Sequence, residues 1–257
     1  MQRSLDGEER IDRPEYEQQL YLGSLRAQGM DGAKLVFRVD GVDCMVGGKA
    51  ILSDVSVTVR SGDRIALLGA NGSGKSTLLR RIVQSWPGDS NIRWGQGVIL
   101  GMLQQEHARS EAMDRQTVLS AMRERASGEE SALRAVLDQF LFSGREVDRM
   151  VKDISYGERV RLELALLVGG GANLLMLDEP TSHLDLPAVE SLQSALGAFR
   201  GPMIVVSHDR AFLQGIGVTA VWLANHGSLK VIEGVDALGS VLSAMDQAAK
   251  NAVIRQA

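Results

Sequence analysis

Three short segments of this chain contain residue types that can hold phosphate groups and a metal ion. GANGSGKST at 69–77 is rich in glycine and ends in a lysine and two hydroxyl residues, ISYGER stands at 154–159, and NLLMLDEP at 173–180 ends an apolar run in two carboxylates. Glycine-rich turns and paired carboxylates are the usual means of holding a polyphosphate with its metal. The order of the three segments predicts a nucleotide site that is divided between two surfaces.

The first segment has the composition of a phosphate-binding loop. Gly69 and Gly74 allow backbone conformations that turn successive amide groups toward one centre, and the helix expected near Lys75 points its positive end there. Lys75 then supplies a positive charge to the β and γ phosphates, and the Ser76 hydroxyl is the expected Mg²⁺ ligand. We expect Thr77 to reach the α phosphate.

Two carboxylates follow the apolar strand LLMLD. Asp178 and Glu179 are predicted to lie at the carboxyl edge of a sheet, where ligands of such folds bind. Asp178 can hold Mg²⁺ through water, and Glu179 can orient or deprotonate an attacking water. Taken without Lys75, the same pair is compatible with a strand that is followed by an acidic helix cap.

Polar residues that follow two other apolar strands are expected at the same carboxyl edge of the sheet. His208, in VVSHDR, can donate to a γ phosphate and so sense its presence, although a histidine at such a place is also compatible with a structural role. Gln105, in GMLQQEH, can touch the metal shell or the attacking water. Gln104 is an equally suitable polar end for that strand.

Hydrophobic periodicity predicts an α/β sheet with a helical insert. Strands are expected in 35–68, 97–103, 174–178 and 203–207, helices in 78–86, 155–168 and 187–199, and a closing antiparallel pair in AVWLA and LKVIE. The expected divisions are a polar N-terminal extension at 1–33, a core at 34–235 with a helical subdomain at 106–165, and an amphipathic helix at 236–257 with Leu238, Val241, Leu242 and Met245 on one face.

Composition limits the class of protein. The chain has 257 residues, 28 of them glycine, a net charge of −4 and one cysteine, Cys44. It lacks a basic block of the kind that binds free DNA, and it has neither an apolar signal core nor a run long enough to span a membrane. We therefore expect a cytoplasmic protein with no disulfide framework and no free DNA binding.

In this order the motifs resemble those of ATP-binding cassette (ABC) ATPases, over residues 34–235. GANGSGKST, Gln105, ISYGE, LLMLDEPTSHLD and VVSHDR are similar to the Walker A, Q-loop, signature, Walker B with D-loop, and H-loop. The resemblance implies a P-loop NTPase fold with a mostly parallel core sheet, an antiparallel β subdomain and a helical signature subdomain. It also implies MgATP hydrolysis with Lys75, Gln105, Glu179 and His208 in catalytic roles, and Ser76, Gln105 and Asp178 at the metal.

The same resemblance implies a second cassette as partner. ATP would lie between the Walker A residues of one cassette and the signature of the other, in a homodimer or with a different chain. The nucleotide-binding residues are then Gly69, Asn71, Gly72, Ser73, Gly74, Lys75, Ser76 and Thr77 on one side and Ser155, Tyr156, Gly157, Glu158 and Asp185 on the other.

A narrower resemblance is to the ABC-F branch, whose members act on ribosomes. It is carried by the short segment between Lys75 and Gln105, by Glu158 at the end of the signature, by TSHLD and by SHDRAFL. This implies a translation factor, with antibiotic protection as one purpose. The alternative is the ATP-binding subunit of an ABC transporter, docked on membrane subunits.

Two positions depart from the family pattern. The segment Cys44-Met45-Val46-Gly47-Gly48 has no aromatic residue where many cassettes stack adenine, so methionine or valine must pack on the base and selectivity for adenine should be weak. Tyr156 replaces the first glycine of the signature, and its hydroxyl either donates to the nucleotide or packs on its own helix.

Overall fold

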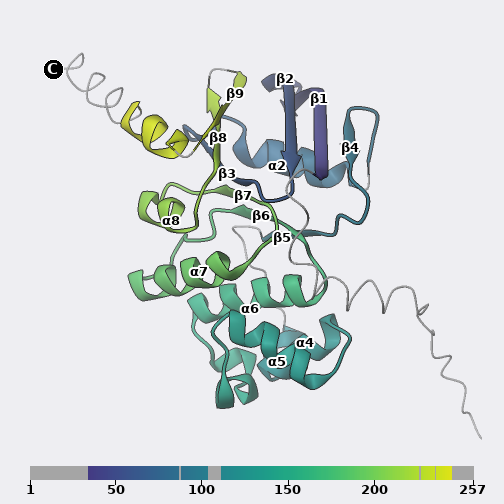
Figure 1. Cartoon of the computed structure of the whole chain (residues 1–257), viewed down its shortest axis with the longest axis vertical. Helices are drawn as coiled ribbons and strands as arrows, with labels where there is room; N and C mark the ends of the chain where they lie inside the picture. Colours follow the sequence, from purple (N-terminus) through teal and green to yellow (C-terminus); the bar gives the residue numbers. More distant parts are fainter. Residues whose placement is uncertain (1–33, 87, 104–110, 226, 235, 245–257) are drawn as a thin grey trace, which may run out of the picture.

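The computed structural model describes residues 34–86, 88–103, 111–225, 227–234 and 236–244 (Figure 1). The expected N-terminal extension at 1–33, the two glutamines Gln104 and Gln105, and the C-terminal residues from Met245 onward lie outside these ranges. The described chain forms two sheets with helices packed around them.

The larger sheet has six strands in the order β5-β6-β7-β3-β8-β9. Its first five strands are parallel neighbours, and β9 pairs antiparallel with β8. The mostly parallel core sheet expected from the sequence is therefore present. The strands are β3 (Arg64–Gly69), β5 (Leu100–Leu103), β6 (Leu174–Asp178), β7 (Met203–Val206), β8 (Ala220–Asn225) and β9 (Ser228–Glu233).

The central strands are short and apolar because both faces of the sheet are covered. On β6, Leu175 and Leu177 belong to one hydrophobic cluster, whereas Leu174 and Met176 belong to another on the opposite face. Both clusters draw alternate residues from β3 and β7 in the same way. The sheet is thus covered by an apolar layer on each face, and the polar side chains of its central strands lie at the strand ends.

A smaller antiparallel sheet of three strands has the order β2-β1-β4, with β1 (Leu35–Val46), β2 (Lys49–Arg60) and β4 (Ile92–Trp94). Strand β4 was not expected, because three residues are too few to show a periodicity. It pairs with β1, where the rings of Phe37 and Trp94 lie 4.9 Å apart between centroids. This sheet stands beside helix α2 (Lys75–Gln84) in Figure 1.

The helices of the middle of the chain form a body at the opposite end of the molecule, at the bottom of Figure 1. They are α3 (Glu111–Asp114), α4 (Val118–Arg125), α5 (Glu130–Gln139), the 3₁₀ helices η1 (Gly144–Asp148) and η2 (Val151–Asp153), and α6 (Tyr156–Gly169). Helix α6 joins this body to the sheet, because it packs against α4, α5, α7 and β5. The N-terminus of α6 is therefore placed by contacts on both sides.

Helices α7 (Leu186–Ala198) and α8 (Arg210–Gly215) follow β6 and β7. The half-buried guanidinium of Arg64, at the start of β3, donates to the carbonyl oxygens of Leu196 in the last turn of α7, of Phe199 just after it and of Ile216 just after α8, at 2.7–2.8 Å. The last carbonyl oxygens of a helix lack a full set of partners within it, so this one cation helps to satisfy the ends of both helices.

Two sequence expectations are refined at the edges of the sheet. The strand expected from residue 97 begins at Leu100, after a turn at Gly97. The C-terminal helix is described for residues 237–244, where Leu238, Val241 and Leu242 are buried. These three side chains are the apolar face that the sequence predicted for this helix.

Candidate nucleotide-binding site

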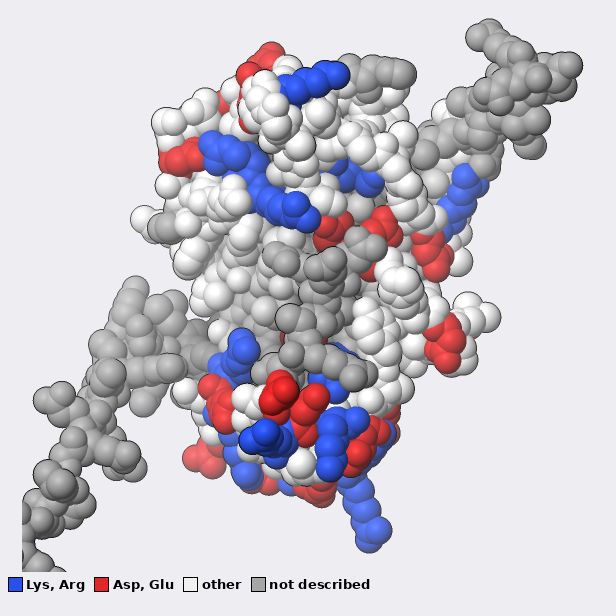
Figure 2. Space-filling model, turned by 180° about the vertical axis from the view of Figure 1, so that it is seen from behind, with Lys and Arg blue, Asp and Glu red and all other residues white. Residues whose placement is uncertain are grey.

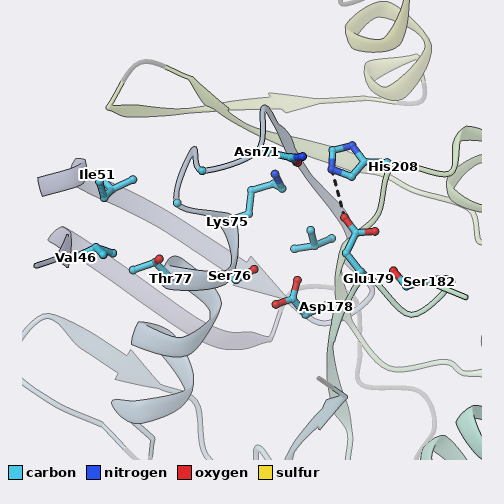
Figure 3. A pocket seen from close by; sticks show the side chains of 13 residues that line it. Val46, Ile51, Asn71, Lys75, Ser76, Thr77, Asp178, Glu179, Ser182 and His208 are labelled. Carbon is cyan, nitrogen blue, oxygen red and sulfur yellow. Dashed lines mark ion pairs between the residues drawn. The ribbon is translucent and has the colours of Figure 1, made fainter. Parts of the chain in front are cut away.

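A pocket of ≈ 740 Å³ opens at the carboxyl edge of the large sheet, between the end of β6, the start of α2 and the β1–β2 turn (Figure 3). Its walls combine the glycine-rich loop with two carboxylates and a histidine. The described lining residues are Val46, Ile51, Asn71, Gly72, Gly74, Lys75, Ser76, Thr77, Asp178, Glu179, Ser182, Val206 and His208.

The glycine-rich loop fits between β8 and the small sheet because Gly69 and Gly74 have no side chains. A Cβ added at Gly69, whose φ is +148°, would stand 2.4 Å from the carbonyl oxygen of Ala224. One at Gly74, with φ +98°, would stand 3.0 Å from Ile51 and Leu52. Gly74 is also the N-cap of α2 and provides no side-chain cap, so the first amides of this helix are left for another acceptor.

The side chain of Lys75 folds back onto this loop and contacts its backbone. Its Nζ donates to the carbonyl oxygens of Gly69, at 2.9 Å, and Ala70, at 3.0 Å. Burial lowers the pKa of Lys75, whereas the nearby carboxylates of Glu179 and Asp178 act in the opposite direction. A third donor position of the ammonium group remains for a phosphate oxygen.

Asp178 ends β6 as a nearly buried carboxylate that is 6% exposed. Its Oδ1 has no hydrogen-bond partner among the described residues. A buried carboxylate oxygen without a partner is costly, and a hydrated metal ion would satisfy it. Together with the Ser76 hydroxyl in the same pocket, this oxygen suits Mg²⁺, which prefers few protein oxygen ligands and several waters.

Glu179 is held in a strained backbone conformation with φ +50°. Its amide donates to the Val206 carbonyl at 2.9 Å, and its Oε1 lies 3.4 Å from Nε2 of His208 (Figure 3). Burial raises the pKa of the Glu179 carboxyl, and His208 opposes this shift. The two side chains expected at the γ phosphate are therefore brought together and contact each other.

The signature residues lie elsewhere. None of Ser155, Tyr156, Gly157 and Glu158 lines the pocket of the described chain. Ser155 is the N-cap of α6 and accepts from the amide of Glu158, whose carboxylate accepts in return from the Ser155 amide and from Arg149. Glu158 is thus engaged within its own subdomain, and Tyr156, which is 40% exposed, is the more accessible of the two side chains.

Gly157 sets how closely α6 approaches α7. A Cβ at this position would stand 2.6 Å from the Cβ of Ala188, which is too close for undisturbed packing. At the start of α7, Asp185 caps the helix by accepting from the Ala188 amide at 3.0 Å. The signature and Asp185 therefore form one surface that is separate from the pocket.

Ser182, Ile51 and Val206 line the pocket but were not singled out from the sequence. Ser182 lies beside Glu179, in a turn that its amide closes on the Glu179 carbonyl at 3.1 Å. Ile51, on β2, lies at the far end of the pocket near Val46 (Figure 3). A serine after a carboxylate pair was a weak signal for Ser182, and nothing in the periodicity of β2 marked Ile51.

The family model described as ABC transporter matches residues 52–182, which include the loop and both carboxylates. The chain belongs to the ATP-binding cassette family. The fold class and the family inferred from the motifs are therefore confirmed, and this cassette is an ATPase domain.

Similar curated proteins belong to the ABC-F branch. The ATP-binding protein YdiF of Bacillus subtilis (strain 168) is 40% identical over 68% of this chain and 27% of its own length. The ATP-binding protein Uup of Escherichia coli (strain K12) is 36% identical over 76% and 31%. The energy-dependent translational throttle protein EttA of Haemophilus influenzae (strain ATCC 51907 / DSM 11121 / KW20 / Rd) is 33% identical over 77% and 36%. The cassette thus spans less than half the length of each.

Solved structures agree on the fold. MJ1267, an ATP-binding cassette of an ABC transporter, superposes with a TM-score of 0.67 over 81% of this chain and 95% of its own, at 17% identity. Within the described part of the cassette, no helix is both long and apolar enough to cross a membrane.

The close contact between α6 and α7 predicts that Gly157→Ala destabilises the cassette. The added methyl group must displace Ala188, and we expect the free energy of unfolding to fall by about 1–2 kcal/mol in urea denaturation. The matched control is Gly197→Ala, at an exposed position of α7 where an added Cβ meets nothing within 4 Å. The free energy of unfolding of this control should rise by about 0.5–1 kcal/mol. Equal changes in the free energy of unfolding of both variants would contradict the packing argument.

Proposed function

We propose that this cassette binds and hydrolyses MgATP at a site that a second cassette completes, and that it acts as an ABC-F-like factor on ribosomes in the cytoplasm. The pocket that gathers Lys75, Asp178, Glu179 and His208 at one sheet edge is the observation that supports this most strongly. The proposed extent of the cassette is residues 34–235, with the helical subdomain at 106–165 and flanking segments at 1–33 and 236–257.

In this proposal the loop amides and Lys75 bind the triphosphate, since they direct positive charge at one centre. Gly69, Asn71, Gly72, Ser73, Gly74 and Thr77 are the other proposed loop contacts. Ser76 and Asp178 would hold Mg²⁺, with Gln105 also proposed in its shell, and the ion would offset charge on the β and γ phosphates.

Glu179 is the proposed base. Its raised pKa suits proton removal from water near neutral pH, because a stronger base takes the proton more readily. When a γ phosphate is present, Nε2 of His208 can leave Glu179 and donate to the phosphate instead. Binding of ATP would in this way free the carboxylate for the attacking water.

The surface of Ser155, Tyr156, Gly157, Glu158 and Asp185 is proposed to contact the nucleotide of the partner cassette. The amides at the N-terminus of α6 can donate to a phosphate of the partner's ATP, because the helix dipole favours negative charge there. Glu158 and Asp185 would act by fixing the two helix starts, since both carboxylates are occupied as caps.

The identity of 33–40% to ABC-F relatives supports a ribosomal target, and EttA is named as a translational throttle protein. Antibiotic protection is one purpose that such binding could serve. On the face shown in Figure 2, acidic and basic side chains are interspersed over the helical body. In that body Glu130 forms ion pairs with Arg123 and Arg134. This pattern favours local contacts with a partner over binding along free DNA.

Replacing the proposed base should separate binding from turnover. We expect Glu179→Gln to bind ATP with unchanged affinity and to release phosphate at least about a hundredfold more slowly, since the amide cannot take a proton. Glu190→Gln, an exposed change on α7, is the matched control and should keep the full rate. Phosphate release by Glu179→Gln at the normal rate would exclude this assignment.

The divided site predicts that ATP brings two cassettes together. In light scattering, the Glu179→Gln protein should change from monomer to dimer when ATP is added, because ATP then joins the pocket of one copy to the signature of the other. The same protein with ADP serves as the control. A monomer under both conditions would contradict self-pairing and point to a different chain as partner.

The ribosomal role predicts nucleotide-dependent binding. Glu179→Gln protein should sediment with ribosomes in ATP and remain in the supernatant in ADP, because only the γ phosphate holds the closed state. Glu179→Gln combined with Lys75→Ala, which weakens phosphate binding, is the control and should not sediment. Equal sedimentation in ATP and ADP, or ATP-dependent binding to solubilised membrane proteins instead, would favour the transporter alternative.

A further inference from the structure

We propose that a second cavity, on the outer side of the phosphate loop, binds a small amphipathic carboxylic acid, and that this acid tightens ATP binding. This outer cavity measures ≈ 520 Å³ and lies between residues 69–70 of the loop, the β8–β9 hairpin and the helix at 237–244. The acid site goes beyond the proposed function, whereas its effect on ATP rests on that function.

Most of the wall of the outer cavity is apolar. Lys230 pairs with Leu223 across the hairpin, and Ile232 lies two residues further along β9, so the three side chains share one face. Leu223 and Ile232 line the cavity together with Val241 of the helix at 237–244. Figure 1 shows this helix, in yellow, beside β8 and β9. A cavity of this size and composition suits the apolar body of a small molecule.

Lys230 gives this apolar cavity one positive charge. Among the described residues no acidic side chain lines the outer cavity, and none forms an ion pair with Lys230. A lysine covers apolar surface with its methylene groups and keeps its ammonium group at the edge of that surface, in water. The wall and this single cation therefore select a ligand that has an apolar body and one negative charge.

Two uncharged polar residues favour a carboxylate as the charged group. Asn225, at the end of β8, and Ser240, in the helix, are the other polar residues of the described lining. Amide and hydroxyl groups can each donate a hydrogen bond. One ammonium group with neutral donors matches a singly charged carboxylate, whereas a phosphate monoester carries about two negative charges. The ligand class is therefore a free carboxylic acid with an apolar tail.

The phosphate loop separates the outer cavity from the nucleotide pocket. Gly69 and Ala70 line the outer cavity, later residues of the loop line the nucleotide pocket, and no described residue lines both. The carbonyl oxygens of Gly69 and Ala70 also accept from Nζ of Lys75. A ligand packed on this backbone restricts the groups that position the ammonium group, so less conformational freedom is lost when ATP binds. By linkage, ATP tightens binding of the acid by the same factor.

The first test is calorimetric titration of the full chain, without nucleotide, with octanoate and with octan-1-ol, its uncharged counterpart of equal length. Octanoate should bind at least about fivefold more tightly than octanol, and Lys230→Gln should remove this difference, because only the acid pairs with the ammonium group. Lys34→Gln, an exposed change outside the cavity, is the matched control and should preserve the difference. No binding of octanoate, or an equal preference in both variants, would overturn the proposal.

A second pair of variants tests the location of the acid. Ser240→Phe places a ring in the outer cavity and should abolish octanoate binding. Ser243→Phe, an exposed change on the same helix but outside the described lining, should keep it. Equal octanoate binding by the two variants would place the acid elsewhere on the molecule and would contradict the assignment.

The effect on ATP is measured as the Kd of MgATP for the Glu179→Gln chain, which prevents turnover. Saturating octanoate should lower this Kd about two- to fivefold, and the effect should disappear when Ser240→Phe is added. An unchanged or raised Kd in octanoate would refute the coupling through Gly69 and Ala70. Failure of ATP to bind while octanoate still binds would instead contradict the proposed function and not the acid site.

Discussion

The close approach of the phosphate loop to strand β8 is the constraint on which the site depends. At Gly69 the chain passes so near the Ala224 carbonyl that a side chain has no room, and the loop can then turn its amides and Lys75 toward one centre. The same loop touches β2 at Gly74. The loop is therefore fixed between both sheets by packing that lies outside the pocket.

Parallel pairing extends this constraint to the carboxylates. Asp178 pairs in register with Val206, and Val206 pairs with Leu67 two residues before the loop, so three strand ends meet at one level. Asp178 and Glu179 are consecutive but differ in their surroundings, because one lacks a partner and the other contacts His208. Adjacent carboxylates can thus serve a metal and a water without competing.

Much of this arrangement could be predicted from the sequence. The apolar runs of β3, β6 and β7 and the loop at 69–77 have spacings that few folds share, so the sheet and its family were correctly inferred. Strand β4 and residues Ile51 and Ser182 were missed because each depends on contacts between distant segments, which leave no local pattern. The engagement of Glu158 with Arg149 and the Ser155 amide was missed for the same reason.

The signature half of the site is positioned from two sides. Helix α6 is linked to the helical body through Arg159, which donates to Asp114 and to the Val151 carbonyl, and through the Glu158 pair with Arg149. On its other side, α6 packs against α7, where Gly157 meets Ala188, and against β5 of the sheet. The polar bonds of α6 are therefore made to the helical body, whereas its contacts with α7 and the sheet belong to one apolar core, so the signature is positioned by both.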